Sequence, residues 1–267
     1  MVAPVNLPAG PPPPMQAWAL LLEYDGTPFL GWQRQAEGLT VQGVLEAAAA
    51  RLSAWLPESC AVAGRTDTGV HAAGQVARLL LPEGFSPGKV RDALNFHLRP
   101  HPVAVLRASP APDGWHPRFS ATWRAYAYRI LNRRAPPALD RHRAWHVDRP
   151  LDAAAMAEAA AMLVGHHDFT SFRAAACQAS GPVRTLDRLE VRRDGDVLEV
   201  AAEARSFLHH QVRNMVGTLK LVGEGRWRPA QAAEALAARD RRAAGPTAPA
   251  AGLTLLRVDY PADPFGR

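Results

Sequence analysis

Residues 64–71 (GRTDTGVH) hold the residue type best suited to covalent or acid–base chemistry. Asp67 follows Arg65 closely, and three glycines (Gly64, Gly69 and Gly74) permit tight backbone turns around it. A nearby cation favours the ionised carboxylate, so Asp67 could serve as a nucleophile or a base. An aspartate in a turn also commonly accepts hydrogen bonds from its own turn amides. Taken alone, this stretch leaves both interpretations open.

Residues 207–217 (FLHHQVRNMVG) form a second candidate cluster. On a helix, His210, Arg213, Asn214 and Gly217 would share one face at three-to-four-residue spacing. Arg213 could then pair with a carboxylate, and Gly217 would let another backbone approach closely. The adjacent His209 and His210 would point to different faces, which argues against a metal site there.

Residues 118–128 (RFSATWRAYAY) interleave basic and aromatic side chains on a predicted strand. Arg118, Arg124 and Tyr126 would suit a surface that stacks a base and binds phosphate. The alternative is a sheet face that packs its tyrosines into the core. The pattern alone does not choose between them.

The lysines, cysteines and histidines exclude several classes of protein. Neither of the two lysines, Lys89 and Lys220, stands in a Gly-Lys-Ser/Thr context, which excludes a phosphate-binding P-loop. The two cysteines, Cys60 and Cys177, lie far apart and form no CxxC motif, which argues against a thiolate zinc site and for a reducing compartment. No HExxH motif surrounds the histidines, so no metal site is predicted.

The charge of the chain favours an anionic partner. There are 31 Lys plus Arg against 25 Asp plus Glu in 267 residues, and with only two lysines nearly all the basic residues are arginine. Guanidinium groups bind phosphate with two parallel hydrogen bonds and stack on bases, which fits nucleic acid. Arginine-rich codon usage is the competing explanation. No apolar run approaches the ~18 residues of a membrane span, so no membrane contact is predicted.

Hydrophobic patterning predicts an alternation of strands and helices that would position these clusters. The expected strands are 17–24, 61–63, 75–81, 103–108, 122–131, 186–193, 197–204 and 253–260. The expected helices are 40–55, 86–98, 152–164, 210–222 and 230–238, with Thr40, Ser86 and Asp152 at the first three N-termini. We predict a disordered proline-rich tail (1–16), an N-terminal α/β subdomain with the Asp67 loop (17–112) and a C-terminal α/β subdomain (113–267).

Nine short stretches follow one another along the chain in a recognisable order. They are 24–26 (YDG), 31–35 (GWQRQ), 63–72 (AGRTDTGVHA), 118–122 (RFSAT), 168–169 (DF), 177–179 (CQA), 182–185 (PVRT), 209–217 (HHQVRNMVG) and 248–249 (AP). Together they resemble one family, the bacterial tRNA pseudouridine synthases A, which isomerise uridines in the anticodon stem-loop of tRNA. The similarity runs from about residue 17 to residue 260.

The resemblance implies an α+β fold with mainly antiparallel sheets. Two similar mixed α/β halves would join side by side, with helices outside and a catalytic cleft between them. It also implies a cytoplasmic homodimer that acts on tRNA, at positions 38, 39 and 40, without a metal ion or an organic cofactor. The target uridine would leave its stack to enter the cleft.

The resemblance also implies roles for individual residues. Asp67 would be the catalytic aspartate, Arg213 its pairing arginine and Tyr126 the residue that stacks on the target base. Arg65 would be a basic residue that engages the RNA near the site. We further expect substrate contacts from Arg118, Arg124 and His71.

Two departures from the family pattern and two rival functions need testing. Ala251 stands where the family usually has an acidic residue, and the stretch after Ala179 lacks a common lysine, whose phosphate contact Arg173 or Arg184 could replace. One rival is an inactive relative that only binds RNA. The other is a metal-dependent hydrolase that uses the histidines.

Overall fold

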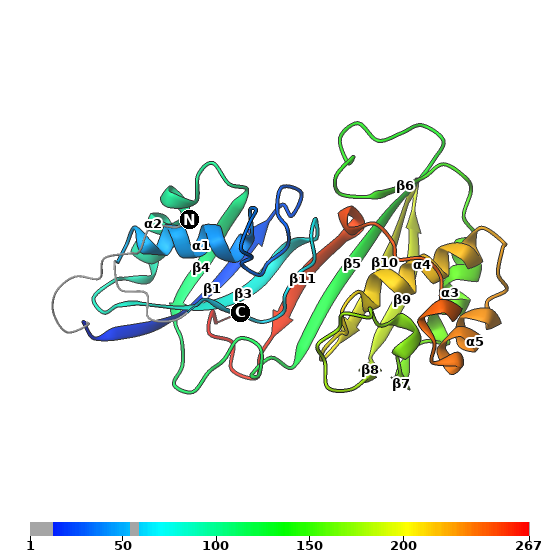
Figure 1. The fold of residues 1–267 in the computed structure, drawn as a ribbon. Helices are drawn as coiled ribbons and strands as arrows, with labels where there is room; N and C mark the ends of the chain where they lie inside the picture. Colours follow the sequence, from blue (N-terminus) through cyan, green and yellow to red (C-terminus); the bar gives the residue numbers. More distant parts are fainter. Residues whose placement is uncertain (1–12, 54–58, 267) are drawn as a thin grey trace. The chain divides into compact units, whose positions relative to one another are not determined.

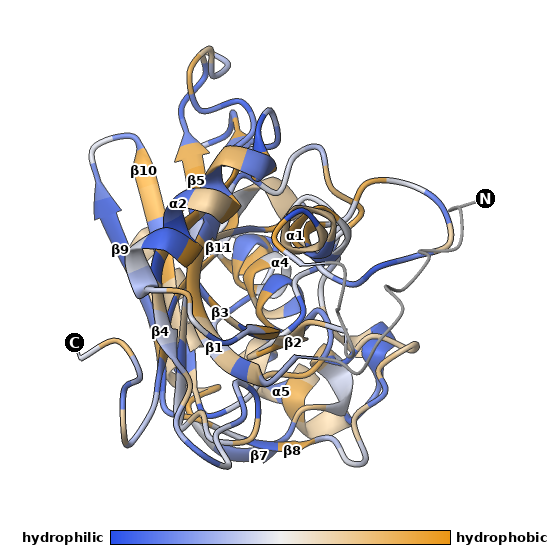
Figure 2. Ribbon diagram, turned by 90° about the vertical axis from the view of Figure 1, so that its left-hand side faces the viewer, coloured by the Kyte–Doolittle hydropathy of each residue, from blue (hydrophilic) through white to orange (hydrophobic). Residues whose placement is uncertain are grey.

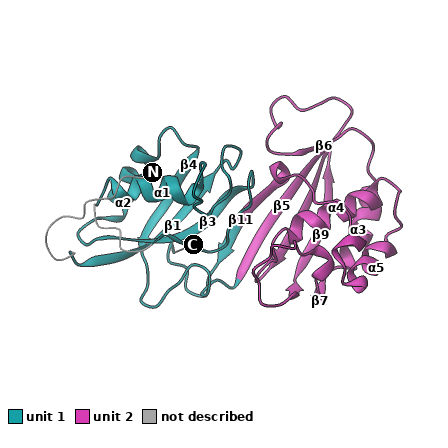
Figure 3. Ribbon diagram, in the orientation of Figure 1, with its two compact units in different colours: residues 1–122, 257–267 teal, residues 123–256 magenta. Residues whose placement is uncertain are grey.

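The computed structural model of the chain describes residues 13–53 and 59–266, which divide into two units (Figures 1 and 3). Unit 1 holds the described residues up to Thr122 together with those from Arg257 onward, and unit 2 is Trp123–Leu256. Both units combine helices with mainly antiparallel strands, so the α+β class is confirmed.

The division between the units differs from the predicted boundary at residue 112. Residues 113–122 and the end of the chain fold with unit 1, because two long-range hydrogen bonds join them. The Thr122 amide donates to the Asp259 carbonyl at 2.9 Å, and the Tyr260 hydroxyl donates to the Pro117 carbonyl at 2.8 Å.

Unit 1 is built on the antiparallel strands β4 (Val103–Pro110), β1 (Met15–Tyr24) and β3 (His71–Pro82), in that order, with β2 (Ala61–Val62) paired to β3. Most of the second half of β1 is buried, which its apolar sequence explains. Helix α1 (Val41–Ala50) begins at Thr40, whose hydroxyl accepts from the Gly43 amide, and α2 (Pro87–Leu98) begins at Ser86.

The predicted disordered tail is too long at its C-terminal end. Met15 pairs with Pro82 and Gln16 with Leu81, so strand β1 starts inside the stretch assigned to the tail. The Glu83 amide also donates to the Pro14 carbonyl at 3.0 Å, which adds another hydrogen bond beside this pairing. Residues 1–12 of the predicted tail lie outside the described residues.

Unit 2 is built on β5 (Trp123–Asn132), β10 (Val197–Ala204) and β9 (Arg188–Asp194), antiparallel and in that order, with β6 (Trp145–Val147) parallel to β5. β7 (Gly165–Asp168) and β8 (Val183–Leu186) form a separate ribbon. β11 (Leu253–Asp259) begins in unit 2 and ends in unit 1. The helices are α3 (Ala153–Ala161), α4 (Gln211–Gly223) and α5 (Ala230–Ala238), with 3₁₀ turns η1 (Thr170–Phe172), η2 (Arg241–Ala243) and η3 (Ala250–Gly252).

The strands of unit 2 differ in hydropathy according to their place in the sheet. Figure 2 shows β10 as largely hydrophobic and its neighbour β9 as largely hydrophilic. Buried Leu198 comes from β10, and buried Tyr128 and Ile130 come from β5, which pairs with β10 on its other side. Charged side chains on the terminal strand of this group discourage pairing with another chain.

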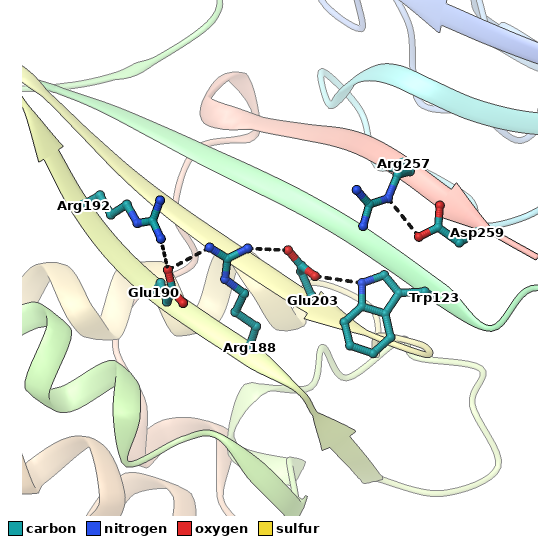
Figure 4. Close-up of polar contacts among 7 residues, drawn as sticks. All are labelled: Trp123, Arg188, Glu190, Arg192, Glu203, Arg257 and Asp259. Carbon is teal, nitrogen blue, oxygen red and sulfur yellow. Dashed lines mark hydrogen bonds and ion pairs between the residues drawn. The ribbon is translucent and has the colours of Figure 1, made fainter. Parts of the chain in front are cut away.

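Several arginines of unit 2 pair with acidic residues on one face of its sheet (Figure 4). Arg188 donates to Glu203 at 2.7 Å and to Glu190 at 2.8 Å, and Arg192 donates to the same oxygen of Glu190. The Trp123 indole donates to the second oxygen of Glu203 at 2.8 Å. These arginines therefore contribute little unbalanced charge.

In the part of the chain that the structure describes, no helix is long and apolar enough to cross a membrane.

Candidate active site

Asp67 lies in a tight loop between β2 and β3 of unit 1. The Ala63 amide donates to the Val76 carbonyl at 2.9 Å, which extends the β2–β3 pairing up to the loop. A turn then closes with the Val70 amide donating to the Asp67 carbonyl at 3.1 Å, and Gly69 takes a φ of 76° within it. The turn fixes the backbone from which the Asp67 carboxylate projects.

Residues 25–32, which we call the clamp loop, hold the Asp67 loop through backbone contacts. The Trp32 amide donates to the Thr66 carbonyl at 3.0 Å, and the Gly69 amide donates to the Phe29 carbonyl at 3.3 Å. A Cβ at Gly31, where φ is 94°, would lie 2.7 Å from the Thr66 carbonyl oxygen. One at Gly26 would lie 2.0 Å from the Val70 carbonyl oxygen. Only glycine permits this approach at either position.

A network of buried side chains is hydrogen-bonded to the same loop. The Tyr24 hydroxyl hydrogen-bonds to the Thr66 hydroxyl at 2.8 Å, and the Gln75 amide donates to the Gly64 carbonyl at 2.8 Å and to Tyr24 at 3.3 Å. All three side chains are buried. A satisfied polar network in this position rigidifies the loop.

His71 contacts the clamp loop directly. Its ring Nδ1 accepts the Gly26 amide at 3.0 Å and lies 3.2 Å from the Asp25 carboxylate, and the residue is 5% exposed. This observed role is structural, and its contact with substrate stays a prediction. Arg65, in contrast, is exposed on the same loop as Asp67.

Arg118 belongs to a turn of unit 1 that is organised by a histidine. The amides of Arg118 and Phe119 donate to the His116 Nδ1 at 3.1 and 3.4 Å. Burial lowers the pKa of His116, and the positive charges of Arg78 and Arg118 lower it further, so the ring stays a neutral acceptor. The turn presents Phe119, 71% exposed, with the Arg118 guanidinium 5.8 Å from its ring centroid.

Phe119 is the residue of this turn that sequence reasoning missed as a candidate. Its signal was an aromatic residue next to Arg118 in the matched RFSAT stretch. An exposed aromatic ring beside a guanidinium is an arrangement on which nucleobases stack. The strand pattern concealed it, because Phe119 precedes β5 instead of lying on it.

Tyr126 and Arg124 lie on β5 of unit 2. Tyr126 pairs with Ala202 of β10, and its ring meets Phe207 edge to face at a centroid distance of 5.2 Å. Arg124 is 7% exposed, and its guanidinium donates to the Arg205 carbonyl. Arg124 therefore helps to hold the segment after β10, and its predicted contact with substrate is untested.

Arg213 projects from the first turn of α4, also in unit 2. Its Nε donates to the Ala248 carbonyl at 2.8 Å, and the Ala248 amide donates back to the Arg213 carbonyl at 3.1 Å. The reciprocal pair sets the plane of the guanidinium. His210, the N-cap of α4, has a left-handed φ of 63°, a costly conformation that is common where a side chain must be aimed precisely.

Residues 245–249, which we call the strap, lie against the backbone of α4 and carry Ala248. A Cβ at Gly217 would lie 1.7 Å from the Pro246 carbonyl oxygen, so the strap requires glycine there. Side chains complete its attachment: Thr247 donates to Asn214 at 2.6 Å, and Tyr128 donates to the Pro249 carbonyl at 2.7 Å. Burial raises the pKa of Tyr128, which keeps its hydroxyl a donor.

Comparison with known proteins assigns the chain to a family. A family profile described as "tRNA pseudouridine synthase" matches residues 21–120 and 159–261. The tRNA pseudouridine synthase A of Acidiphilium cryptum (strain JF-5) is 66% identical over 95% of this chain and 100% of its own length. The chain belongs to the tRNA pseudouridine synthase A family. The resemblance predicted from the motifs is therefore confirmed.

Other members of the tRNA pseudouridine synthase A family match over a similar extent. The protein of that name from Paramagnetospirillum magneticum is 60% identical over 93% of this chain and 96% of its own. The Gluconobacter oxydans protein is 52% identical over 99% of this chain and 97% of its own. A chain of a solved Cbf5-Nop10-Gar1 complex aligns over 90% of this chain and 49% of its own, with a TM-score of 0.35 at 13% identity.

The departures from the family pattern lie in unit 2. Ala251 falls in η3, where Gly252 packs against the Tyr128 ring. Arg173 donates to the carbonyls of Cys177 and Ala179 at 2.9 and 2.8 Å, which shapes the loop that lacks the usual lysine.

Arg184 completes that loop from the start of β8. It donates to the carbonyls of Gly181 and Val183 at 3.1 and 2.6 Å.

Among the predicted site residues, the structure places Arg65, Asp67, His71 and Arg118 in unit 1, and Arg124, Tyr126 and Arg213 in unit 2.

Proposed function

We propose that this protein is a tRNA pseudouridine synthase that converts uridine to pseudouridine at positions 38, 39 and 40 of the anticodon stem-loop. The observation that carries the proposal is the identity of 52–66% to synthases A over nearly their full length. A supporting observation is the Asp67 loop, which both its glycine contacts and its polar network hold in one conformation.

The reaction breaks the N1–C1′ bond of uridine and rejoins the base to the ribose through C5. The proton on C5 is released and one is returned at N1, so no atom is gained or lost overall. In this proposal Asp67 acts as the ionised group, by attack on C1′ or C6 or by removal of a ribose proton. The three routes share the requirement for a carboxylate that is anionic and aimed.

The other residues receive supporting roles in the same proposal. Arg213 would pair with Asp67 and keep it ionised, with its plane set by the Ala248 carbonyl. Tyr126 would stack on the flipped base. Arg65, Arg118 and the newly identified Phe119 are exposed and would contact RNA, while His71 and Arg124 would hold backbone near the substrate.

The assembly belongs to the proposal as well. The two halves would place their sheets side by side, with helices outside and the catalytic cleft between them, in a cytoplasmic homodimer that needs neither metal nor organic cofactor. Full activity after exhaustive EDTA treatment would support the metal-free part of this proposal. Loss of activity that added metal restores would contradict it.

The test is release of tritium from tRNA labelled at C5 of uridine. We expect Asp67→Asn to reduce release on the order of a thousandfold or more, with tRNA affinity retained. Asp92→Asn is the matched control, because Asp92 is an exposed aspartate on α2 that pairs with Arg91. Normal release by Asp67→Asn would refute the assignment, and a wild type that binds tRNA without release would indicate an inactive RNA-binding relative.

A further inference from the structure

The connection between β5 and β6 in unit 2, residues 133–144, concentrates positive charge outside the proposed catalytic residues. We call it the basic loop. It holds four arginines and one aspartate, a net charge of +3 in a chain whose total is +6. Its arginines are Arg133, Arg134, Arg141 and Arg143, and all four are exposed. In Figure 1 the loop stands out beyond the ends of β5 and β6.

The base of the basic loop is firmly anchored. Buried Asn132 donates to the carbonyls of Val147 and Arg149 at 3.0 and 2.6 Å, and its side-chain oxygen accepts from the Leu151 amide at 3.1 Å. The His146 ring hydrogen-bonds to the Arg133 carbonyl at 2.8 Å across the neck of the loop. The neck of the loop is therefore preorganised, which reduces part of the entropic cost of binding a partner.

Nearby acids balance only part of the charge of this loop. Arg133 lies 3.6 Å from Asp196, and the one acid of the loop, Asp140, lies 3.9 Å from Arg129 of β5, outside the loop. Arg141 donates to the Ala138 carbonyl and to the ring of His142, both in the same loop, and neither partner is an acidic residue. Among the described residues, neither Arg134 nor Arg141 has an acidic partner within ion-pair distance. The paired Arg188 and Arg192 of Figure 4 show the opposite arrangement.

We infer that the basic loop is a docking surface for the phosphate backbone of RNA, away from the reacting uridine. Guanidinium groups offer five donors each in a planar fork that matches phosphate, and the internal contacts of Arg141 use only part of them. The inference rests on the proposed function, because substrate tRNA is the RNA in question. The loop would add affinity without sequence preference and would leave the chemical step unchanged.

An anionic lipid surface is the competing partner for such a loop. The tip exposes Leu139 to 96%, which could favour a membrane. A single leucine offers little apolar area, whereas peripheral membrane binding requires a much larger apolar face or a lipid anchor. The small apolar area of the tip therefore favours RNA over a membrane, and vesicles serve as the discriminating probe.

The experiment measures the dissociation constant for unmodified tRNA against salt concentration. Loss of two phosphate contacts in Arg134→Gln/Arg141→Gln should lower the slope of log K against log salt by about two. At low salt the affinity should fall a few-fold to about tenfold. The single-turnover rate at saturating tRNA should match that of the wild type.

Two variants make the result specific to the basic loop. Arg192→Gln/Arg242→Gln removes the same charge from arginines that have acidic partners, and it should keep the wild-type slope. Arg134→Lys/Arg141→Lys retains the charge and should restore most of the slope. An unchanged slope in the glutamine variant, or an equal decrease in the control, would overturn the inference.

The remaining outcomes distinguish an RNA partner from a lipid partner, and failure of the inference from failure of the proposed function. Loss of binding to phosphatidylglycerol vesicles with tRNA binding intact would also overturn the inference, in favour of a lipid partner. Failure of the wild type to form pseudouridine would refute the proposed function, and the salt slope would still report on the loop.

Discussion

The Asp67 loop of unit 1 and the strap of unit 2 are held in place by different kinds of contact. The Asp67 loop takes two backbone hydrogen bonds from the clamp loop, with the Tyr24–Gln75 network beneath it. The strap has one backbone hydrogen bond to Arg213 and otherwise depends on side chains such as those of Tyr128 and Asn214. Backbone contacts tolerate changes of side chain, so the strap should be the more sensitive of the two.

Both regions require a glycine where two backbones approach closely, and replacing that glycine gives the largest predicted effect. Gly26→Ala and Gly217→Ala would place a Cβ 2.0 and 1.7 Å from a carbonyl oxygen, so each should lower the free energy of unfolding by ~3 kcal/mol and abolish tritium release. Urea unfolding measures the first effect. Gly88→Ala is the control, because nothing lies within 4 Å of its Cβ on α2, and it should stabilise by up to ~1 kcal/mol. Wild-type stability in either clash variant would show that the backbones separate easily.

Removal of single hydroxyls tests whether the two regions differ as described. Tyr128→Phe releases the Pro249 carbonyl and should slow single-turnover product formation about tenfold, because a small displacement of Ala248 turns the Arg213 guanidinium. Tyr24→Phe should slow it only about twofold, since the backbone bonds to Thr66 and Gly69 remain. Both variants should lose about 1 kcal/mol of stability.

Tyr260→Phe provides the control for this pair. It also loses a hydrogen bond to a proline carbonyl, that of Pro117 at 2.8 Å, but one that is not attached to the Asp67 loop or to the strap. Its turnover at saturating tRNA should equal that of the wild type. A larger defect in Tyr24→Phe than in Tyr128→Phe would reverse the comparison.

The smallest predicted effect concerns pH and the Arg118 turn. The pKa of His116 is lowered from its ordinary value of 6.5 on folding, so the neutral ring contributes stability that is complete above pH 6.5 and is lost as pH falls below it. The melting temperature of the wild type should therefore fall slightly more between pH 7 and pH 5 than that of His116→Asn. Equal losses in both proteins would show that folding does not lower the pKa of His116.

Local signals in the sequence predicted the starts of helices better than the ends of helices or the starts of strands. Thr40, Ser86 and Asp152 are the N-caps that their side chains indicated, because capping depends only on neighbouring amides. α1 ends at Ala50 and not near residue 55, although residues 54–58 lie outside the described part. β3 begins at His71, before the predicted residue 75, because Ala72 pairs with Tyr24 of a distant strand.

In the candidate site, too, the sequence predicted local motifs and missed contacts between segments that lie far apart in the chain. Motifs predicted the family and singled out Asp67, Tyr126 and Arg213. They gave no indication that Gly26 and Gly31 press against the Asp67 loop, since such contacts join segments far apart in the sequence. The burial of Arg124 was equally hidden, because a strand pattern does not reveal whether neighbouring segments cover both faces.

The return of the chain from Leu256 to unit 1 has a consequence for biosynthesis. The amide of Thr122 needs the carbonyl of Asp259, and the carbonyl of Pro117 needs the hydroxyl of Tyr260. A ribosome delivers all of unit 2 before it delivers these partners. The half that carries Asp67, although made first, therefore acquires its last native contacts after the other half is fully synthesised, which reverses the usual N-terminal-first order of domain folding.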